Sequence, residues 1–334
     1  MSAEAGTGSA QFSLKDCTAA TCPYEHSFYL YRIDIVPNAV FVGLFGASLL
    51  GFVGVLAATR RGLPFAVAMV LGLLCEILGY AGRIMSWHNQ WSEDGFLMQI
   101  CCLTIGPAFL AAGIYLCIRQ IVSAFGPENS RIPPQYYTRI FIPCDIISLV
   151  LQAAGGGLAS SAFHQGEPTE TGDHIMIAGL AFQVFTLLVF TALSLDYGLN
   201  TLRHRRRQRA LDPSPGPAAA PAATAKRPLM FRLFPAALAL STVCILWRSV
   251  FRVAELSRGW TGPLMERQDL FVGFEGAMIA AAVLVLNVFH PSLCFGPDIT
   301  DAAPFKMRPS AAKPDTPAAS DSDAKDVEDR GDQR

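Results

Sequence analysis

The stretch Cys75-Glu76-Ile77-Leu78-Gly79-Tyr80-Ala81-Gly82-Arg83-Ile84 is apolar, yet it carries an acid and a base seven residues apart. On an α-helix this spacing corresponds to about 10 Å along the axis and brings both side chains to nearly the same face. The surrounding segment, 63–84, is long enough to cross a bilayer. An ionisable group inside a membrane costs about 3 kcal/mol or more and normally faces the protein interior. The stretch therefore predicts a transmembrane helix with a buried polar site, completed by partners on other spans.

The composition places the chain among membrane proteins. It has 334 residues, of which 51% are hydrophobic and only 16% charged, whereas soluble domains carry about 25% charged residues. The net charge of -1 gives no basic field, so we expect no nucleic-acid partner. Apolar runs of bilayer length predict an all-α bundle of seven transmembrane helices in a polytopic, multi-pass membrane protein. The expected spans are 37–58, 63–84, 96–122, 140–161, 174–195, 233–256 and 269–289.

Positively charged residues set the expected orientation. The loops after the first, third and fifth spans are basic, most strongly at 203–209, and those after the second and fourth are acidic. The positive-inside rule then puts the N-terminus outside and the C-terminus in the cytoplasm. The expected parts are an extracellular tail, a seven-helix membrane domain, a basic Pro/Ala-rich cytoplasmic loop within that domain and a disordered cytoplasmic tail, at 1–36, 37–297, 203–232 and 298–334. Cys17 and Cys22 in the first tail fit a local disulfide or two free thiols equally well.

The orientation also sets the depth of the polar side chains. Three acids and three arginines fall in the outer halves of the second, sixth and seventh spans, and their formal charges cancel: Glu76, Arg83, Arg248, Arg252, Glu255 and Glu275. Gln99 enters the third span from the same side, and the fourth span carries Asp145 and Gln152. Such a cluster either forms an ion-pair network that fixes helix register or lines a cavity for a polar headgroup. The sequence leaves both interpretations open.

These positions together resemble a known family. They are Glu76, Gly79, Tyr80 and Arg83 in the second span, Gln99, Pro107 and Tyr115 in the third, Asp145, Gln152, Gly155 and Gly156 in the fourth, Arg248, Arg252, Glu255 and Gly259 in and after the sixth, and the terminal His290-Pro291. In this combination the chain is similar, over residues 29–297, to the fungal lipid-translocating exporters, the RTA-like proteins named for resistance to aminocholesterol. It departs from the family at Phe274-Glu275, where an aromatic residue followed by Asp is expected.

The resemblance implies a seven-span membrane protein that exports or translocates amphipathic lipids such as sphingoid bases. It also implies resistance to toxic compounds and, in one branch, porphyrin uptake. We therefore expect a transporter or translocator of sphingoid-base-like or sterol-like lipids, or of related toxic compounds, in the plasma membrane among membrane lipids. We expect no cofactor and no ATP hydrolysis by the chain itself, since it has no Gly-x-x-x-x-Gly-Lys-Ser/Thr phosphate loop. The residues expected to bind cargo are Glu76, Arg83, Gln99, Asp145, Gln152, Arg248, Arg252, Glu255 and Glu275.

Two other functional classes deserve comparison. A receptor or sensor for an amphipathic ligand would share the seven spans and the outside N-terminus, although residues 116–120 lack an Asp/Glu-Arg-Tyr triplet. An intramembrane hydrolase would need several histidines and an acid around zinc. None of the six histidines lies in the middle of an expected span and no pair has ligand spacing, so we expect neither an enzyme nor a metal site. For the cargo headgroup, the acids favour an amine, while the arginines favour a phosphate or carboxylate equally well.

Overall fold

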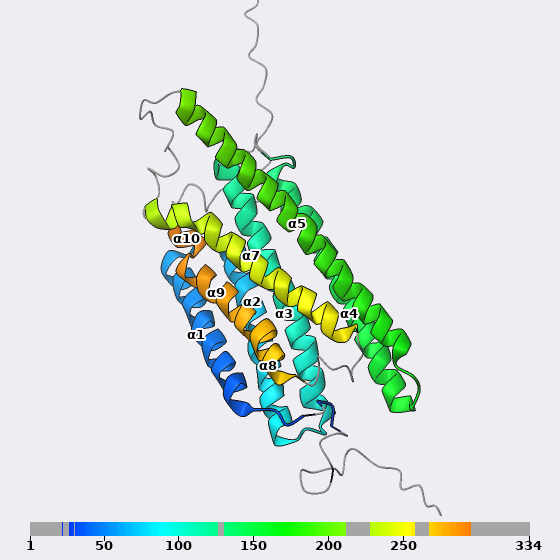
Figure 1. Ribbon diagram of the computed structural model, residues 1–334. Coiled ribbons are helices and arrows are strands. Elements are labelled where there is room, and N and C mark those ends of the chain that lie inside the picture. The colour runs from blue at the N-terminus through cyan, green and yellow to red at the C-terminus, as the bar shows by residue number, and fades with distance from the viewer. Residues whose placement is uncertain are drawn as a thin grey trace, which may run out of the picture. The chain divides into compact units, whose positions relative to one another are not determined.

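A computed structural model describes Cys22 and residues 27–29, 31–125, 130–211, 228–257 and 267–294. The described residues are helical throughout, apart from short turns and connections. The elements, in chain order, are α1 (Ile35–Thr59), α2 (Leu63–His88), α3 (Glu93–Phe125), α4 (Pro134–Gln165), α5 (Glu170–Leu211), α7 (Pro228–Leu256), α8 (Gln268–Leu270), the π-helix η4 (Phe271–Ala277), α9 (Met278–Val288) and α10 (Pro291–Cys294) (Figure 1).

Among the residues that the structure describes, seven helical segments are long and apolar enough to cross a membrane, as the sequence predicts. The last of them, Gln268–Cys294, is composite and joins α8, η4, α9 and α10. Most helices run past the expected spans because helical hydrogen bonding continues into polar sequence. The clearest case is α5, which extends over 42 residues and includes part of the segment expected to be a basic loop.

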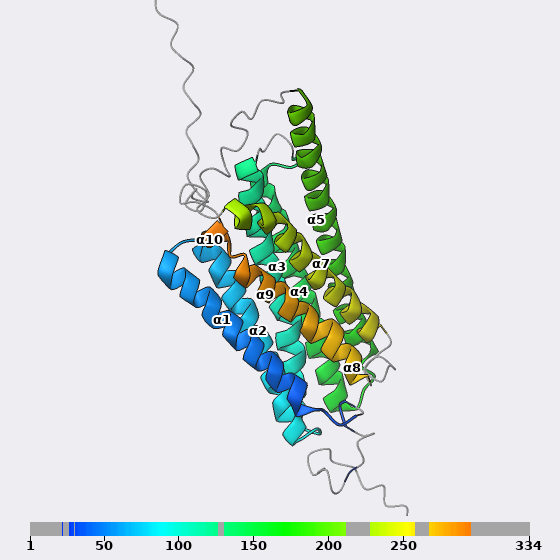
Figure 2. The same cartoon turned by 60° about the vertical axis from the view of Figure 1, so that its left-hand side comes forward.

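The helices pack in two interlocking groups. Helix α2 lies between α1 and α3, while α4 pairs mainly with α5. Helix α7 joins the groups, since it contacts α3, α5 and α9, and α9 closes back onto α1 (Figures 1 and 2). This arrangement brings α2, α3, α7 and η4 together, although they are far apart in the chain.

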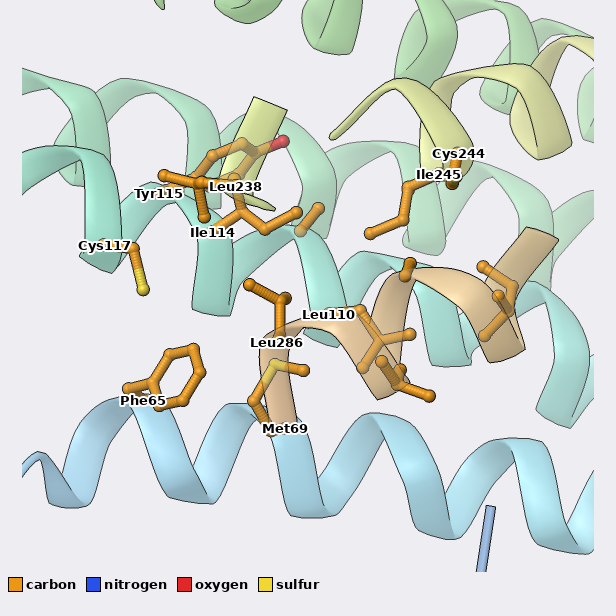
Figure 3. Packing of buried hydrophobic residues seen from close by; sticks show 14 of the residues in the cluster. Phe65, Met69, Leu110, Ile114, Tyr115, Cys117, Leu238, Cys244, Ile245 and Leu286 are labelled. Atoms are coloured by element: carbon orange, nitrogen blue, oxygen red, sulfur yellow. The ribbon is translucent and has the colours of Figure 1, made fainter. Parts of the chain in front are cut away.

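The apolar core takes buried side chains from all seven long helical segments of the described chain. Figure 3 shows Phe65 and Met69 of α2 facing Leu110 and Ile114 of α3, with Leu286 of α9 between them. All five side chains have an exposed fraction of 2% or less. In lipid, helix association depends on this close packing more than on removal of apolar surface from water.

Glycines allow the closest helix contacts. A Cβ on Gly82 of α2 would lie 2.8 Å from the Gly95 carbonyl oxygen of α3, so the two backbones approach closely there. Likewise, a Cβ on Gly155 would collide with the backbone of Gly172 and Met176 in α5. Within this glycine run only Gly155 makes such a close contact, and α4 continues through the run.

Most glycines of α1 make no close contact with another helix. Only Gly51 meets another helix, at the Asn287 side chain of α9. Gly43, Gly46 and Gly54 have no neighbour within 4 Å of an added Cβ. Since α1 lies at the side of the bundle, most of its small residues face away from other helices (Figure 2).

Candidate functional site

A charged cluster forms where α2, α3, α7 and η4 meet. We use this name for seven of the nine residues that the sequence singled out, all with an exposed fraction of 4% or less: Glu76, Arg83, Gln99, Arg248, Arg252, Glu255 and Glu275. Helix α2 contributes Glu76 and Arg83, α3 contributes Gln99, and the others come from α7 and η4. Three acids and three arginines leave the cluster with no net formal charge.

Ion pairs connect the α7 side of the charged cluster to η4. The Arg248 guanidinium contacts both a Glu275 carboxylate oxygen and the Leu103 carbonyl oxygen of α3. Arg252 donates to Glu255 at 2.6 Å and lies 3.7 Å from the second Glu275 oxygen. Glu275 therefore has its ion-pair partners on another helix, α7. The pairs tie α7, η4 and α3 together at one point.

Glu275 lies in a π-helical segment, η4 (Phe271–Ala277). Such wide turns are rare and frequently occur at functional sites. The neighbouring Phe274 ring packs on α7, 5.4 Å from the Phe251 ring and 6.1 Å from that of Trp247. In this π-helix the consecutive residues Phe274 and Glu275 both contact α7. Phe274 and Glu275 stand where the resemblance to RTA-like proteins predicts an aromatic residue followed by Asp.

Arg83 is held by neutral groups rather than by a carboxylate. Its Nε donates to the Asn38 side chain at 3.0 Å, and a terminal nitrogen donates to the Tyr31 hydroxyl at 2.8 Å. Its guanidinium carbon lies 4.0 Å from the centre of the Phe271 ring, a cation–π contact. Sequence reasoning missed Asn38 and Tyr31, because neither carries a charge.

The N-terminal segment also reaches the charged cluster through Tyr29. Its hydroxyl lies 2.8 Å from Gln99 Oε1 and 3.0 Å from the Ser86 hydroxyl. Burial raises the pKa of Tyr29 to about 12, so the phenol keeps its proton and can donate it to Gln99. The segment before α1 is therefore part of the site and not only a tail. Cys22, in the same segment, is disulfide-bonded, and Cys17 lies outside the described residues.

Glu76 lies in the charged cluster but has no arginine partner among the described residues. It forms no ion pair with any described residue, and its Oε1 has no hydrogen-bond partner among them. The reason is that Arg83 is held by Asn38 and Tyr31, while Arg248 is engaged by Glu275. Glu76 Oε1 instead lies against α3, 2.7 Å from where a Cβ on Gly106 would be.

Asp145 and Gln152 lie apart from the charged cluster, between α4 and its neighbours α3 and α5. An Asp145 oxygen accepts a hydrogen bond from Tyr115 of α3 at 2.9 Å, and Thr186 of α5 lies 3.5 Å from the other oxygen. Gln152 donates to Gln183 of α5 at 3.2 Å. The structure therefore separates the nine predicted residues into two groups, the charged cluster and this neutral-donor group.

Room for a ligand lies beside the charged cluster rather than inside it. The cavity that borders Arg83, Gln99, Arg252 and Glu255 has a volume of only about 10 Å³. A second cavity, of about 620 Å³, lies between α3 and α4; we call it the α3–α4 cavity. Its lining comes from Ser27 and Phe28 of the N-terminal segment, from α3 between Glu93 and Ile105, from α4 between Leu149 and Phe163, and from Thr169 and Met176. Phe96 and Ile100 border both cavities and form the wall between them.

Comparison with known proteins assigns the chain to a family. Residues 69–298 match the family described as RTA1 like protein. The chain belongs to the RTA1-like family. It is 32% identical over 298 residues to the Sphingoid long-chain base transporter RSB1 of Saccharomyces cerevisiae, covering 81% of this chain and 74% of that protein.

Two further yeast relatives extend the comparison. The chain is 27% identical to Protoporphyrin uptake protein 1 of Saccharomyces cerevisiae, over 65% of each chain. It is 26% identical to Protein RTM1 of Saccharomyces cerevisiae, over 68% of each chain. No solved structure matches.

The RTA1-like match begins inside α2 and includes all nine predicted residues. It leaves out α1 and the N-terminal segment. Asn38 and Tyr31, which accept the hydrogen bonds of Arg83, therefore precede the matched region. The same is true of Tyr29, the partner of Gln99.

Proposed function

We propose that this RTA1-like protein moves sphingoid long-chain bases, or closely similar single-chain amphipathic amines, across a membrane. The observation that carries the proposal is the 32% identity to a sphingoid long-chain base transporter over 81% of the chain. A volume of about 620 Å³ between α3 and α4, within the usual range for small-molecule sites, supports it.

We further propose that the charged cluster holds the helices in register. Its six charged side chains are buried, and four of them form ion pairs, Arg248 and Arg252 with Glu275 and Glu255. The adjoining space is too small for a headgroup. Removing one member should then destabilise the fold, whereas a direct role in cargo binding predicts loss of transport from a folded protein. Glu275→Gln distinguishes these outcomes, because Gln keeps nearly the same volume and can still hydrogen-bond. Flux per folded molecule should remain if the cluster is structural.

For the orientation we propose an extracellular N-terminus and a cytoplasmic C-terminus in the plasma membrane. The support is the basic character of the first, third and fifth loops. A tag after Arg209 should be accessible only from the cytoplasm, and a tag before Tyr24 only from outside. Finding both tags on one side would contradict the arrangement. Imaging of the tagged protein tests the choice of membrane.

The function is tested with purified full-length protein in lipid vesicles. A fluorescent long-chain base is added to one leaflet, and its leaflet distribution is followed with a membrane-impermeant quencher. Vesicles with protein should equilibrate the base faster than protein-free vesicles, without ATP. Equal rates would contradict the proposal. Ligand-dependent signalling in cells, with no change in leaflet distribution, would instead favour a receptor.

A further inference from the structure

We propose that the α3–α4 cavity is a binding site for a single-chain lipid amine, with its ammonium group at Glu93 and its hydrocarbon chain along α3 toward Ile105. This assignment deepens the proposed function and rests on it for the identity of the cargo. The cavity lies outside the charged cluster, and Gln152 is the one residue of the nine predicted from sequence that lines it.

The shape of the cavity suits one lipid chain. Its lining follows α3 from Glu93 to Ile105, which corresponds to about 18 Å along the helix. A bilayer's hydrocarbon core is about 30 Å thick, so this length is slightly more than one leaflet. Most lining side chains are apolar, and Ala153 and Gly157 are exposed, so the cavity is open to the surroundings of the bundle.

Charge selects the headgroup. Among the described residues that line the cavity, Glu93 carries the single formal charge, and no lining residue is Lys or Arg. Its carboxylate accepts a hydrogen bond from Ser160 at 3.3 Å and lies 3.1 Å from His164 Nε2. The Glu93 side chain is 29% exposed and so remains accessible to a ligand. A carboxylate without a fixed arginine or lysine suits an ammonium group and repels a phosphate.

Aromatic rings surround the same end of the cavity. The Phe28 ring stacks on Phe96 of α3, with centres 5.0 Å apart, and lies 5.9 Å from the Phe163 ring of α4. All three residues line the cavity near Glu93. Aromatic faces attract ammonium groups, so the rings and the carboxylate favour the same chemistry. Phe28 also bridges α3 and α4 at this end.

The buried side chain of Gln152 offers a second polar contact within the cavity. The exposed fraction of Gln152 is 4%, and its Oε1 has no hydrogen-bond partner among the described residues although Nε2 is bonded to Gln183. Buried carbonyl oxygens are normally satisfied. Because Gln152 lines the cavity, its free oxygen can accept a hydrogen bond from a hydroxyl on a bound chain.

Cys101 provides a readout that does not depend on transport. It is an exposed free cysteine that lines the cavity, whereas Cys75 and Cys144 do not line it. Purified full-length protein in lipid nanodiscs is alkylated with N-ethylmaleimide and analysed by peptide mass spectrometry. Octadecylamine should slow alkylation of Cys101 and leave Cys75 and Cys144 unchanged. Octadecyl phosphate should protect none of them.

Two pairs of variants test the headgroup and the chain separately. Glu93→Gln should raise the octadecylamine concentration for half protection about tenfold, since it removes one charge-assisted contact. The control is Asp94→Asn, on the same turn of α3 but outside the cavity lining. Gly157→Leu should block binding by filling the cavity, because nothing lies within 4 Å of its added Cβ. Gly54→Leu, equally unhindered on α1, is its control.

The outcomes separate this assignment from the proposed function. Two outcomes would overturn the cavity assignment and keep the proposed function. One is transport of the long-chain base while Cys101 stays unprotected. The other is unchanged binding by the Gly157→Leu variant. Protection of Cys101 without any transport would keep the site and overturn the function. Equal protection by the amine and the phosphate would refute the role given to Glu93.

Discussion

The change Glu275→Leu should destabilise the protein because it leaves a buried arginine without its carboxylate. Arg248 and Glu275 have exposed fractions of 2% and 1%, and after the change the charged cluster keeps three arginines but only two acids. Removing one partner of a buried ion pair typically costs about 3–5 kcal/mol. We expect the lower part of this range, since Arg248 keeps the Leu103 carbonyl oxygen and Arg252 keeps Glu255.

The expected loss converts into a measurable shift in unfolding temperature. For a chain of 334 residues each kcal/mol corresponds to roughly 1.5 °C, so a loss of about 3 kcal/mol lowers the midpoint by roughly 4–5 °C. The measurement is thermal unfolding of purified protein in lipid nanodiscs, followed by tryptophan fluorescence. Glu275→Gln should lose less, about 1–2 kcal/mol, because a neutral hydrogen bond replaces a charged one.

A double variant distinguishes pairing from a general effect of the substitution. Arg248→Leu with Glu275→Leu restores the balance of charge, and replacing a buried pair by apolar residues is often neutral or stabilising by about 1–4 kcal/mol. The double variant should therefore be more stable than either single variant. Arg131→Leu is the matched control, since it breaks an arginine–carboxylate pair, with Asp196, in which the Arg131 side chain is 72% exposed. A Glu275→Leu protein as stable as the wild type would refute the reasoning.

The remaining predictions concern the other helix contacts. Gly155→Leu should sharply reduce the amount of protein in the membrane because its side chain collides with the α5 backbone, whereas Gly43→Leu, with open space, should not; immunoblots of membrane fractions compare them. Asp145→Leu should cost about 1–3 kcal/mol in thermal unfolding by leaving the Tyr115 hydroxyl without its acceptor, and Asp145→Asn should cost less. Arg83→Lys should lower the unfolding midpoint because one ammonium cannot reproduce the guanidinium's two hydrogen bonds and its ring contact; a midpoint equal to that of the wild type would contradict this.

Hydropathy by itself predicted the seven helices. An apolar run of bilayer length must satisfy its backbone hydrogen bonds without water, and an α-helix does this within one segment. Hydropathy also indicated that Glu76, Arg248 and Glu275 face the interior, because a lipid-facing charge is too costly. Orientation rests on charge bias alone and stays a prediction.

Only the tertiary structure decided which charges meet. The sequence predicted partners on other spans but not which charges pair. In the structure Arg248 bonds to Glu275, and Arg83 bonds to the neutral Asn38 and Tyr31. Nor did the spacing of residues indicate a cavity between α3 and α4. The physical reason is that hydropathy fixes which segments enter the membrane but carries no information on which helices become neighbours. Which helices become neighbours depends on complementary packing, for example the close contact between Gly82 of α2 and Gly95 of α3. The sequence of one helix alone does not specify such a contact.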